Sequence, residues 1–85
     1  MKVGFDRDGW EDYQWWQSQD RQILKRINAL IADIARNGNE GIGKPEPLRN
    51  YDGYWSRRIT GEHRLIYKVS DGEVLIAACR YHYGG

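Results

Sequence analysis

The sequence predicts an α+β protein in which two amino-terminal helices pack on one face of a small, mainly antiparallel sheet. Three observations predict it. Apolar residues recur at helical spacing between residues 20 and 37, a loop rich in glycine and proline follows, and the last third alternates like β-strands joined by tight turns. A chain of 85 residues suits a single domain, residues 1–85, with a modest core.

The helices are predicted from their capping residues and from apolar spacing. Asp8 has the spacing of an N-cap, with an acid three residues later, so the first helix is expected to begin there. Asp20 is a second plausible cap. The amphipathic pattern that follows it comprises Ile23, Leu24, Ile27, Leu30, Ile31 and Ile34. Asn37-Gly38 is a stop signal, and residues 2–5 are predicted to form a short strand.

The second half of the chain is predicted to form a loop and then three strands. Residues 38–53 hold four glycines and both prolines, which is typical of a loop. Strands are expected at roughly 54–59, 63–69 and 73–82. Their alternation defines a more apolar face, which is expected to contact the helices. This face comprises Trp55, Arg57, Ile59, His63, Leu65, Tyr67, Val69, Leu75, Ala77, Cys79, Tyr81 and Tyr83.

The other face carries the candidate catalytic side chains. The lengths of the two hairpin loops decide whether these side chains lie close together. A three-residue loop at Thr60-Gly61-Glu62 would place Arg58 opposite Arg64. A three-residue loop at Ser70-Asp71-Gly72 would place Arg64 and His82 on one face. Two-residue turns, which the sequence also permits, would separate these side chains. The functional hypothesis therefore requires three-residue loops at both hairpins.

Charge and composition narrow the function classes. The net charge of +1 argues against a generic polyanion binder, but the bases cluster at residues 42–68, around one predicted hairpin. Arg57 and Lys68, taken singly, are interpreted as solvated charges. Cys79 is the only cysteine and lies on the apolar face, so a buried thiol is expected and an internal disulfide is impossible. The pattern predicts neither a membrane span nor a signal peptide, which favours a soluble, cytoplasmic protein.

The remaining candidates suit metal-free cleavage of a phosphodiester. Glu46, held between two prolines, is a candidate general base; Arg64, with Arg58, is a candidate phosphate clamp; and His82 is a candidate general acid. No metal-ligand spacing is present and no cofactor is required. Each residue also has an ordinary explanation. Glu46 could be a solvated acid, the arginines could pair with Glu46 and Glu62, and His82 could be a surface residue. His63 is interpreted as a core histidine.

Three segments together resemble the YoeB (Txe) branch of the RelE superfamily, the toxins of bacterial type II toxin–antitoxin modules. They are residues 41–48 (GIGKPEPL), residues 53–60 (GYWSRRIT) with 62–67 (EHRLIY), and residues 77–83 (AACRYHY). The likeness runs from Lys2 to Tyr83, and the motifs agree in order and spacing.

The resemblance implies a RelE-like, microbial-ribonuclease-like fold and metal-free cleavage of mRNA in the ribosomal A site (30S subunit), an mRNA interferase activity that inhibits translation. The site residues it implies are Glu46 as general base, His82 as general acid, Arg64 as transition-state stabiliser, Tyr83 as positioning residue, and Lys44, Arg49 and Arg58 as RNA or phosphate contacts. It also implies a YefM-like antitoxin, a homodimer, and operator DNA bound only through the antitoxin complex.

One alternative stays open. The two glycines that follow Tyr83 leave room for a toxin-fold protein that cleaves poorly and acts mainly as an antitoxin-binding co-repressor. A free-standing RNA-binding module is disfavoured by the small net charge.

Overall fold

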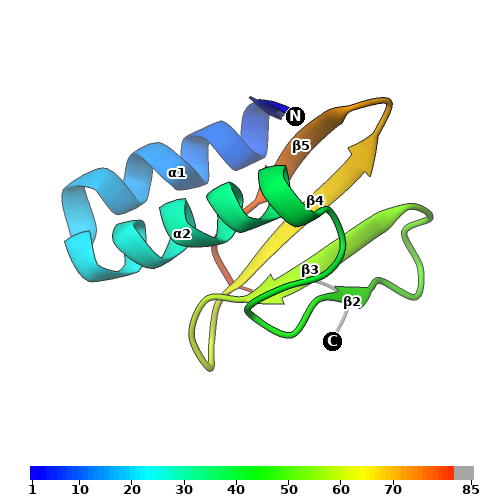
Figure 1. Cartoon of the computed structure of the whole chain (residues 1–85). Coiled ribbons are helices and arrows are strands. Elements are labelled where there is room, and N and C mark those ends of the chain that lie inside the picture. The colour runs from blue at the N-terminus through cyan, green and yellow to red at the C-terminus, as the bar shows by residue number, and fades with distance from the viewer. Residues whose placement is uncertain (82–85) are drawn as a thin grey trace.

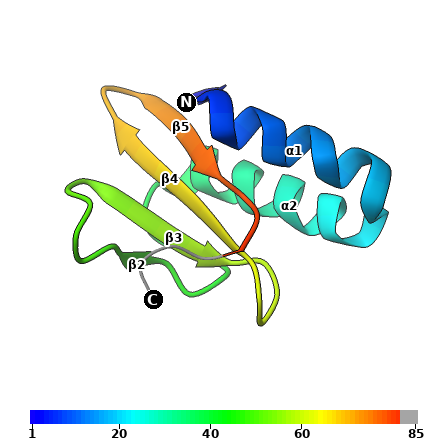
Figure 2. The same cartoon turned by 180° about the vertical axis from the view of Figure 1, so that it is seen from behind.

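The computed structural model describes residues 1–81 and has the predicted α+β architecture. Both helices lie on the same side of a five-stranded sheet, whose other side is seen in the reverse view (Figures 1 and 2). The elements, in chain order, are β1 (Lys2–Phe5), α1 (Arg7–Gln19), α2 (Arg21–Asn37), β2 (Glu46–Pro47), β3 (Tyr54–Arg58), β4 (Arg64–Ser70) and β5 (Glu73–Ala78). The side of the sheet away from the helices is called the open face.

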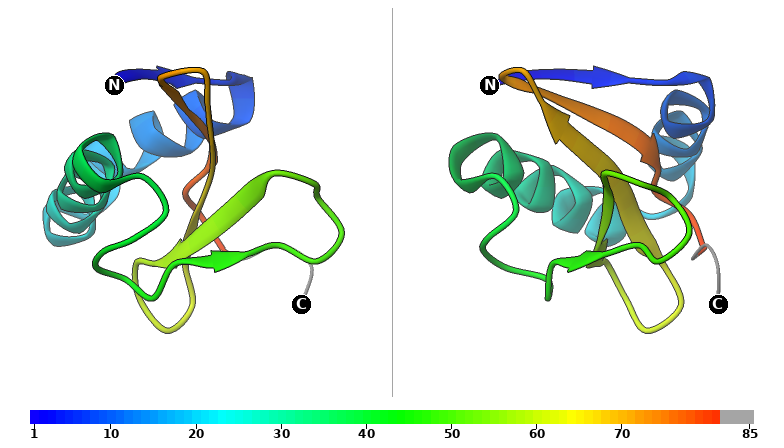
Figure 3. Two further views of the ribbon diagram at one scale, coloured as in Figure 1. Left: turned by 45° about the vertical axis from the view of Figure 1, so that its right-hand side comes forward. Right: turned by 90° about the vertical axis from the view of Figure 1, so that its right-hand side faces the viewer.

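The strand order is β1-β5-β4-β3-β2. Strand β1 runs parallel to β5, and every other neighbouring pair is antiparallel, so the prediction of a mainly antiparallel sheet is confirmed. In the left view of Figure 3 the helices lie to one side of the sheet, with the edge strand β1 at the top and the edge strand β2 at the bottom. No helix within residues 1–81 is long and apolar enough to cross a membrane.

The helix caps agree with the sequence in one case and differ in the other. Asp20 caps α2 as predicted, because its carboxylate accepts the backbone N–H groups of Gln22 and Ile23. Helix α1, however, is capped by Asp6, which accepts the N–H of Gly9 at 2.9 Å. The prediction of Asp8 as the cap is wrong. Strand β1 ends at Phe5, so the first side chain able to cap the helix is that of Asp6.

The amphipathic pattern of α2 forms the centre of the core. Its side chains Ile27, Leu30 and Ile34 are completely buried. They pack with buried residues of α1 and of the helix-facing side of the sheet: Trp16, Ile59, Leu65, Tyr67, Val74, Ile76 and Cys79. The predicted helix-facing residues of β3 and β4 therefore contribute to the core as expected.

The two hairpins differ in loop length. Arg58 pairs with Arg64, and the N–H of Ile59 donates to the carbonyl of His63, so the first loop has the predicted three residues. In the second hairpin Ser70 pairs with Glu73, which leaves a two-residue turn. That three-residue prediction is wrong. Asp71 and Gly72 both have positive φ, 52° and 73°, the backbone of a tight turn whose twist matches the strands it joins.

The shorter turn changes the faces of β5. Val74 and Ile76, not Leu75 and Ala77, point into the core, which corrects the predicted alternation. A β-bulge then inserts Ala77, because Tyr67 pairs with Ile76 while Ile66 pairs with Ala78. The extra residue reverses the alternation again and returns Cys79 to the core, so from Ala78 onward the bulge restores the faces for which the functional hypothesis required a three-residue loop.

Two element boundaries also differ from expectation. Strand β5 ends at Ala78 and does not reach residue 82, because the N–H of Cys79 turns to donate to Asp12 Oδ2 at 3.0 Å. Within the predicted loop, Glu46–Pro47 forms the edge strand β2. Proline is tolerated there because an edge strand leaves one side of its backbone without a ladder partner.

Candidate active site

The open face carries Glu46 on its edge strand. Glu46 pairs with Ser56 of β3, and cross-strand partners direct their side chains to the same face. The flanking prolines, Pro45 and Pro47, restrict the backbone around the carboxylate. Beyond the strand, the N–H of Leu48 donates to the carbonyl of Tyr54 at 2.8 Å and fixes the segment that follows. The glutamate is exposed, as a group that reacts with a large substrate must be.

Two arginines face each other at the other end of the same strands. Arg58 and Arg64 are direct cross-strand partners. Like charges in this position repel, so the arrangement carries a cost unless an anion offsets it. Neither arginine forms an ion pair with a carboxylate within residues 1–81, which excludes the predicted alternative of pairing with Glu46 or Glu62. The pair is therefore a candidate site for a phosphate group.

Glu46 and the arginine pair lie on one face at neighbouring positions. Ser56, the partner of Glu46, is two residues before Arg58 on β3. Positions two apart on a strand share a face and are separated by about 7 Å. The backbone of Arg58 is held on both sides, since its N–H donates to Gly43 and its carbonyl accepts from Arg26. The carboxylate and the cations thus lie on adjacent, rigid positions.

The other predicted contacts flank this group or lie beyond the described residues. Lys44 and Arg49 are both exposed, on either side of β2. Lys44 has a positive φ of 51°, an unusual conformation for the residue before a proline, so the turn into β2 is strained. His82 and Tyr83, the predicted general acid and positioning residue, lie outside the described residues.

Arg57 has a different role from the one predicted. The sequence predicts a solvated charge here, but the side chain is completely buried. The alternation of β3 turns it toward the helices, where it forms an ion pair with Asp33 of α2 at 2.5 Å. This hydrogen bond from the guanidinium is the main reason why the pKa of Asp33 lies below its usual range.

All five N–H donors of the Arg57 guanidinium are used. Besides Asp33, the acceptors are the Tyr67 hydroxyl and the backbone carbonyls of Gly38, Glu40 and Ile42. Three of these acceptors belong to the segment that leads from the end of α2 toward β2. Arg57 therefore fixes the loop that presents Glu46, while its neighbour Arg58 stays exposed. The apolar alternation of Trp55, Arg57 and Ile59 was the signal that could have identified this burial.

His63 and Cys79 are core residues, as predicted. The His63 Nδ1 accepts the N–H of Tyr81 at 2.7 Å, and its ring packs edge-on against Trp16. Burial raises the pKa of the Cys79 thiol to about 12, which removes its nucleophilic form at neutral pH. Within residues 1–81, no three or more His, Cys, Asp or Glu side chains are grouped to hold a metal ion.

Comparison with solved structures identifies the class of protein to which this fold belongs. YafQ from Escherichia coli, solved as its H87Q mutant, has the same fold, with a TM-score of 0.82 over 98% of both chains at 17% identity. The structure of a YoeB/ParE toxin from Agrobacterium tumefaciens is more similar, with a TM-score of 0.93 and 45% identity over 98% of this chain and 100% of that one. The architecture is that of small toxins of this type.

Sequence comparison then assigns the family. The YoeB-like toxins of bacterial type II toxin–antitoxin systems match residues 5–83. Toxin YoeB of E. coli K12 is 57% identical over 98% of this chain and all of its own length. Toxin YoeB of Synechocystis is 56% identical over 98% of both. The chain belongs to the YoeB-like toxin family. A Staphylococcus aureus relative, solved as a YoeB dimer, superposes with a TM-score of 0.91 at 49% identity, covering 98% of both chains.

Proposed function

We propose that this chain is an endoribonuclease that cleaves mRNA in the ribosomal A site and so inhibits translation. The observation that carries the proposal is the opposed pair Arg58 and Arg64, which lacks a carboxylate partner in the described residues and shares a face with Glu46. Membership of the YoeB-like toxin family supports the proposal that the chain acts as a toxin. We also place its action in the cytoplasm, where the ribosome is.

The proposed reaction is an attack by the 2′-hydroxyl of RNA on the adjacent phosphate. Glu46 removes the proton from the hydroxyl, and the 2′-oxygen bonds to phosphorus. Arg64 and Arg58 stabilise the charge that develops on the phosphate oxygens. The bond to the 5′-oxygen breaks, and His82 gives that oxygen a proton while Tyr83 positions the substrate. The products are a 2′,3′-cyclic phosphate and a 5′-hydroxyl, and the residues supply the acid, the base and the cations without a cofactor.

The remaining basic residues and the partners complete the proposal. Lys44 and Arg49, exposed on either side of β2, would contact the RNA backbone. A S. aureus relative has been solved in a heterotetrameric YoeB-YefM toxin-antitoxin complex. By analogy, a YefM-like antitoxin would neutralise this chain, operator DNA would be bound only through that complex, and the free toxin would be a homodimer.

Primer extension on ribosome-bound mRNA tests the proposal. Purified wild-type protein is expected to cut at the A-site codon. Glu46→Ala and His82→Ala are expected to abolish the cut, whereas Glu73→Ala, an exposed acid at the far end of β5, should cut normally. If the folded wild-type chain made no cut while binding its antitoxin, a co-repressor role would replace the proposal.

A further inference from the structure

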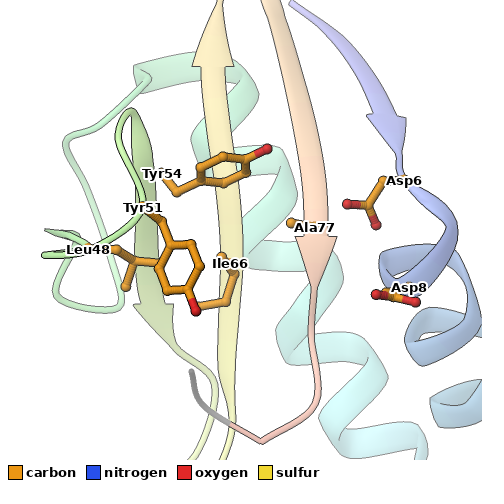
Figure 4. Close-up of a pocket in the computed structure, with 7 residues that line it drawn as sticks. All are labelled: Asp6, Asp8, Leu48, Tyr51, Tyr54, Ile66 and Ala77. Atoms are coloured by element: carbon orange, nitrogen blue, oxygen red, sulfur yellow. The ribbon is translucent and has the colours of Figure 1, made fainter. Parts of the chain in front are cut away.

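A pocket of about 240 Å³ opens on the open face beside Glu46. It is lined by Asp6, Asp8, Leu48, Tyr51, Tyr54, Ile66 and Ala77, and is called the tyrosine pocket below. Figure 4 shows the two carboxylates on one side and the tyrosines with Leu48 on the other, with Ile66 and Ala77 between them. The acid–base scheme uses none of these residues.

The tyrosine pocket adjoins the position of Glu46. Leu48 is two residues beyond Glu46, and Ile66 pairs with Ser56, which pairs with Glu46. Tyr54 precedes Ser56 by two residues on β3, whereas Arg58 follows it by two. Along β3, the open face therefore presents the pocket, then the level of Glu46, then the arginines. If the arginines hold the phosphate of an RNA substrate that is attacked beside Glu46, a neighbouring nucleotide of the same strand would reach the pocket.

The walls of the pocket suit a flat, aromatic ligand. Tyr51 is 48% exposed, whereas Tyr54 is partly buried and has the Lys68 ammonium 5.4 Å from its ring centroid, so the more accessible ring is that of Tyr51. Leu48 and Ile66 add apolar surface. Unstacked bases of single-stranded RNA bind on such aromatic side chains. The volume is below the range of pockets that bind drug-sized molecules, and suits a single ring system.

The two carboxylates define which edge of the ligand can face them. Asp6 uses one oxygen to cap α1 and keeps the other, and Asp8 is exposed in the first helical turn. Carboxylates accept hydrogen bonds and repel phosphates, so an RNA backbone would avoid this side. Amino groups of adenine, cytosine and guanine would be attracted. The O4 carbonyl of uracil would be repelled.

We propose that the tyrosine pocket binds the base of a nucleotide next to the cleaved bond, and that it prefers an amino-bearing base over uracil. This proposal rests on the proposed function for its position in the reaction. The binding of the base itself can be measured without cleavage. The charge gradient across the open face also orients the RNA, with its phosphate at Arg58 and Arg64 and its base at Asp6 and Asp8.

The first experiment measures binding of RNA-like ligands that cannot be cut. 2′-Deoxy trinucleotides lack the attacking hydroxyl and cannot be cut. Four of them, each containing one kind of base, would be titrated into ¹⁵N-labelled protein, and NMR would locate the contact. Shifts are expected at Tyr51, Ile66 and Ala77, larger with cytosine than with uracil as the matched pyrimidine pair. Tyr51→Ala should weaken binding about 5- to 100-fold, because the stacking of one base on an aromatic ring contributes a binding free energy of that size. Tyr51→Phe keeps the ring and should bind normally.

The second experiment measures base preference in cleavage. Ribosome-bound mRNAs that differ only in the bases flanking the cut are compared with wild-type protein and Asp8→Asn. The asparagine can donate to a carbonyl, so the preference for cytosine over uracil should fall about 2- to 10-fold, the value of one hydrogen bond. Glu73→Gln should keep the wild-type preference.

The outcomes separate this inference from the proposed function. If the wild-type protein cuts mRNA but Tyr51→Ala and Asp8→Asn retain its base preference, and no trinucleotide shifts the pocket residues, the inference is wrong and the nuclease stands. If trinucleotides bind as expected but no mRNA is cut, the nuclease fails and the base site stands. Shifts caused only by a lysine- or arginine-containing peptide would also overturn the inference, since they would assign the pocket to a cationic protein segment.

Discussion

Arg57 and Arg58 are adjacent in the sequence and have opposite environments. Arg57 points toward the helices, is completely buried, and donates all five N–H groups to protein acceptors. Arg58 points to the open face, is exposed, and lies opposite a second arginine. On the helix-facing side of β3 the charge of Arg57 is thus balanced within the chain, whereas the Arg58–Arg64 end of the open face keeps positive charge without a carboxylate partner in the described residues.

The difference shows which arginine can act on a substrate. A guanidinium whose donors are all used holds the protein together, because none of its donors is available to a ligand. A guanidinium held by its backbone and surrounded by like charge can bind a phosphate, which removes the repulsion. The predictions that follow test this division, beginning with the largest effect.

Glu46→Gln is expected to lower the rate of mRNA cleavage about 10²- to 10⁴-fold, the usual contribution of a general base. The side chain is exposed, so the free energy of unfolding should change by less than about 0.5 kcal/mol. Single-turnover cleavage on programmed ribosomes and urea unfolding would measure both. Glu73→Gln is the control, and equal cleavage by the two variants would remove Glu46 from the mechanism.

Asp33→Ala tests the buried ion pair by removing the carboxylate that Arg57 contacts. It leaves the Arg57 guanidinium buried without its counter-charge, so the free energy of unfolding should fall by about 3–5 kcal/mol. Urea unfolding monitored by tryptophan fluorescence would measure this change. Glu40→Ala, an exposed acid in the following loop, should lose less than about 0.5 kcal/mol. Comparable losses in the two variants would show that the ion pair has no special role.

Arg64→Ala is expected to reduce cleavage about 10²- to 10³-fold, as for the loss of one group that stabilises transition-state charge. Arg64→Lys should recover only part of the activity, because lysine keeps the charge and loses the paired donors. Arg36→Ala, an exposed base at the end of α2, serves as control. Full activity of Arg64→Ala at physiological salt would contradict the phosphate role.

The smallest expected effect is on acid stability. The folded-state pKa of Asp33 is lowered by its hydrogen bond from Arg57, so its ion pair contributes stability at pH values above the unfolded pKa of 3.8. That contribution should be lost as the pH falls from about 4 through the folded pKa. Asp33→Asn should show a flatter decline in this window when urea unfolding is repeated at each pH.

Asp12 provides a control of opposite sign. Burial raises its pKa, so the folded state takes up this proton first and gains stability as the pH falls. Asp12→Asn should therefore show a steeper acid decline than the wild type. Identical profiles for the Asp33 and Asp12 variants would contradict the assigned shifts.

The sequence was sufficient for those features that depend on local pattern. The periodicity of α2 and its Asp20 cap follow from short-range chemistry and are confirmed. The predicted three-residue loop of the first hairpin is also confirmed, although its residues permitted a shorter turn. The second turn was not decided by its residues, because Ser70-Asp71-Gly72 suits both loop lengths, and the bulge at Ala77 left no pattern of its own. Glycine and proline indicated a loop, and so concealed the edge strand that carries Glu46.

The candidate site could be predicted only where it depends on local sequence pattern. Strand alternation and the three-residue loop were enough to bring Arg58 to Arg64. The burial of Arg57 required knowledge of a partner, Asp33, that lies 24 positions away on another element. The tyrosine pocket joins residues from four separate parts of the chain, which no local pattern could have related.

The most direct test of the account compares Arg57→Ala with Arg58→Ala in two measurements on each protein, the free energy of unfolding and the cleavage rate per folded molecule. The account predicts that Arg57→Ala loses about 3–5 kcal/mol of stability. It predicts that Arg58→Ala keeps its stability within about 0.5 kcal/mol and cleaves at least about tenfold more slowly. A stable Arg57→Ala protein, or an Arg58→Ala protein that cleaves mRNA at the wild-type rate, would contradict it.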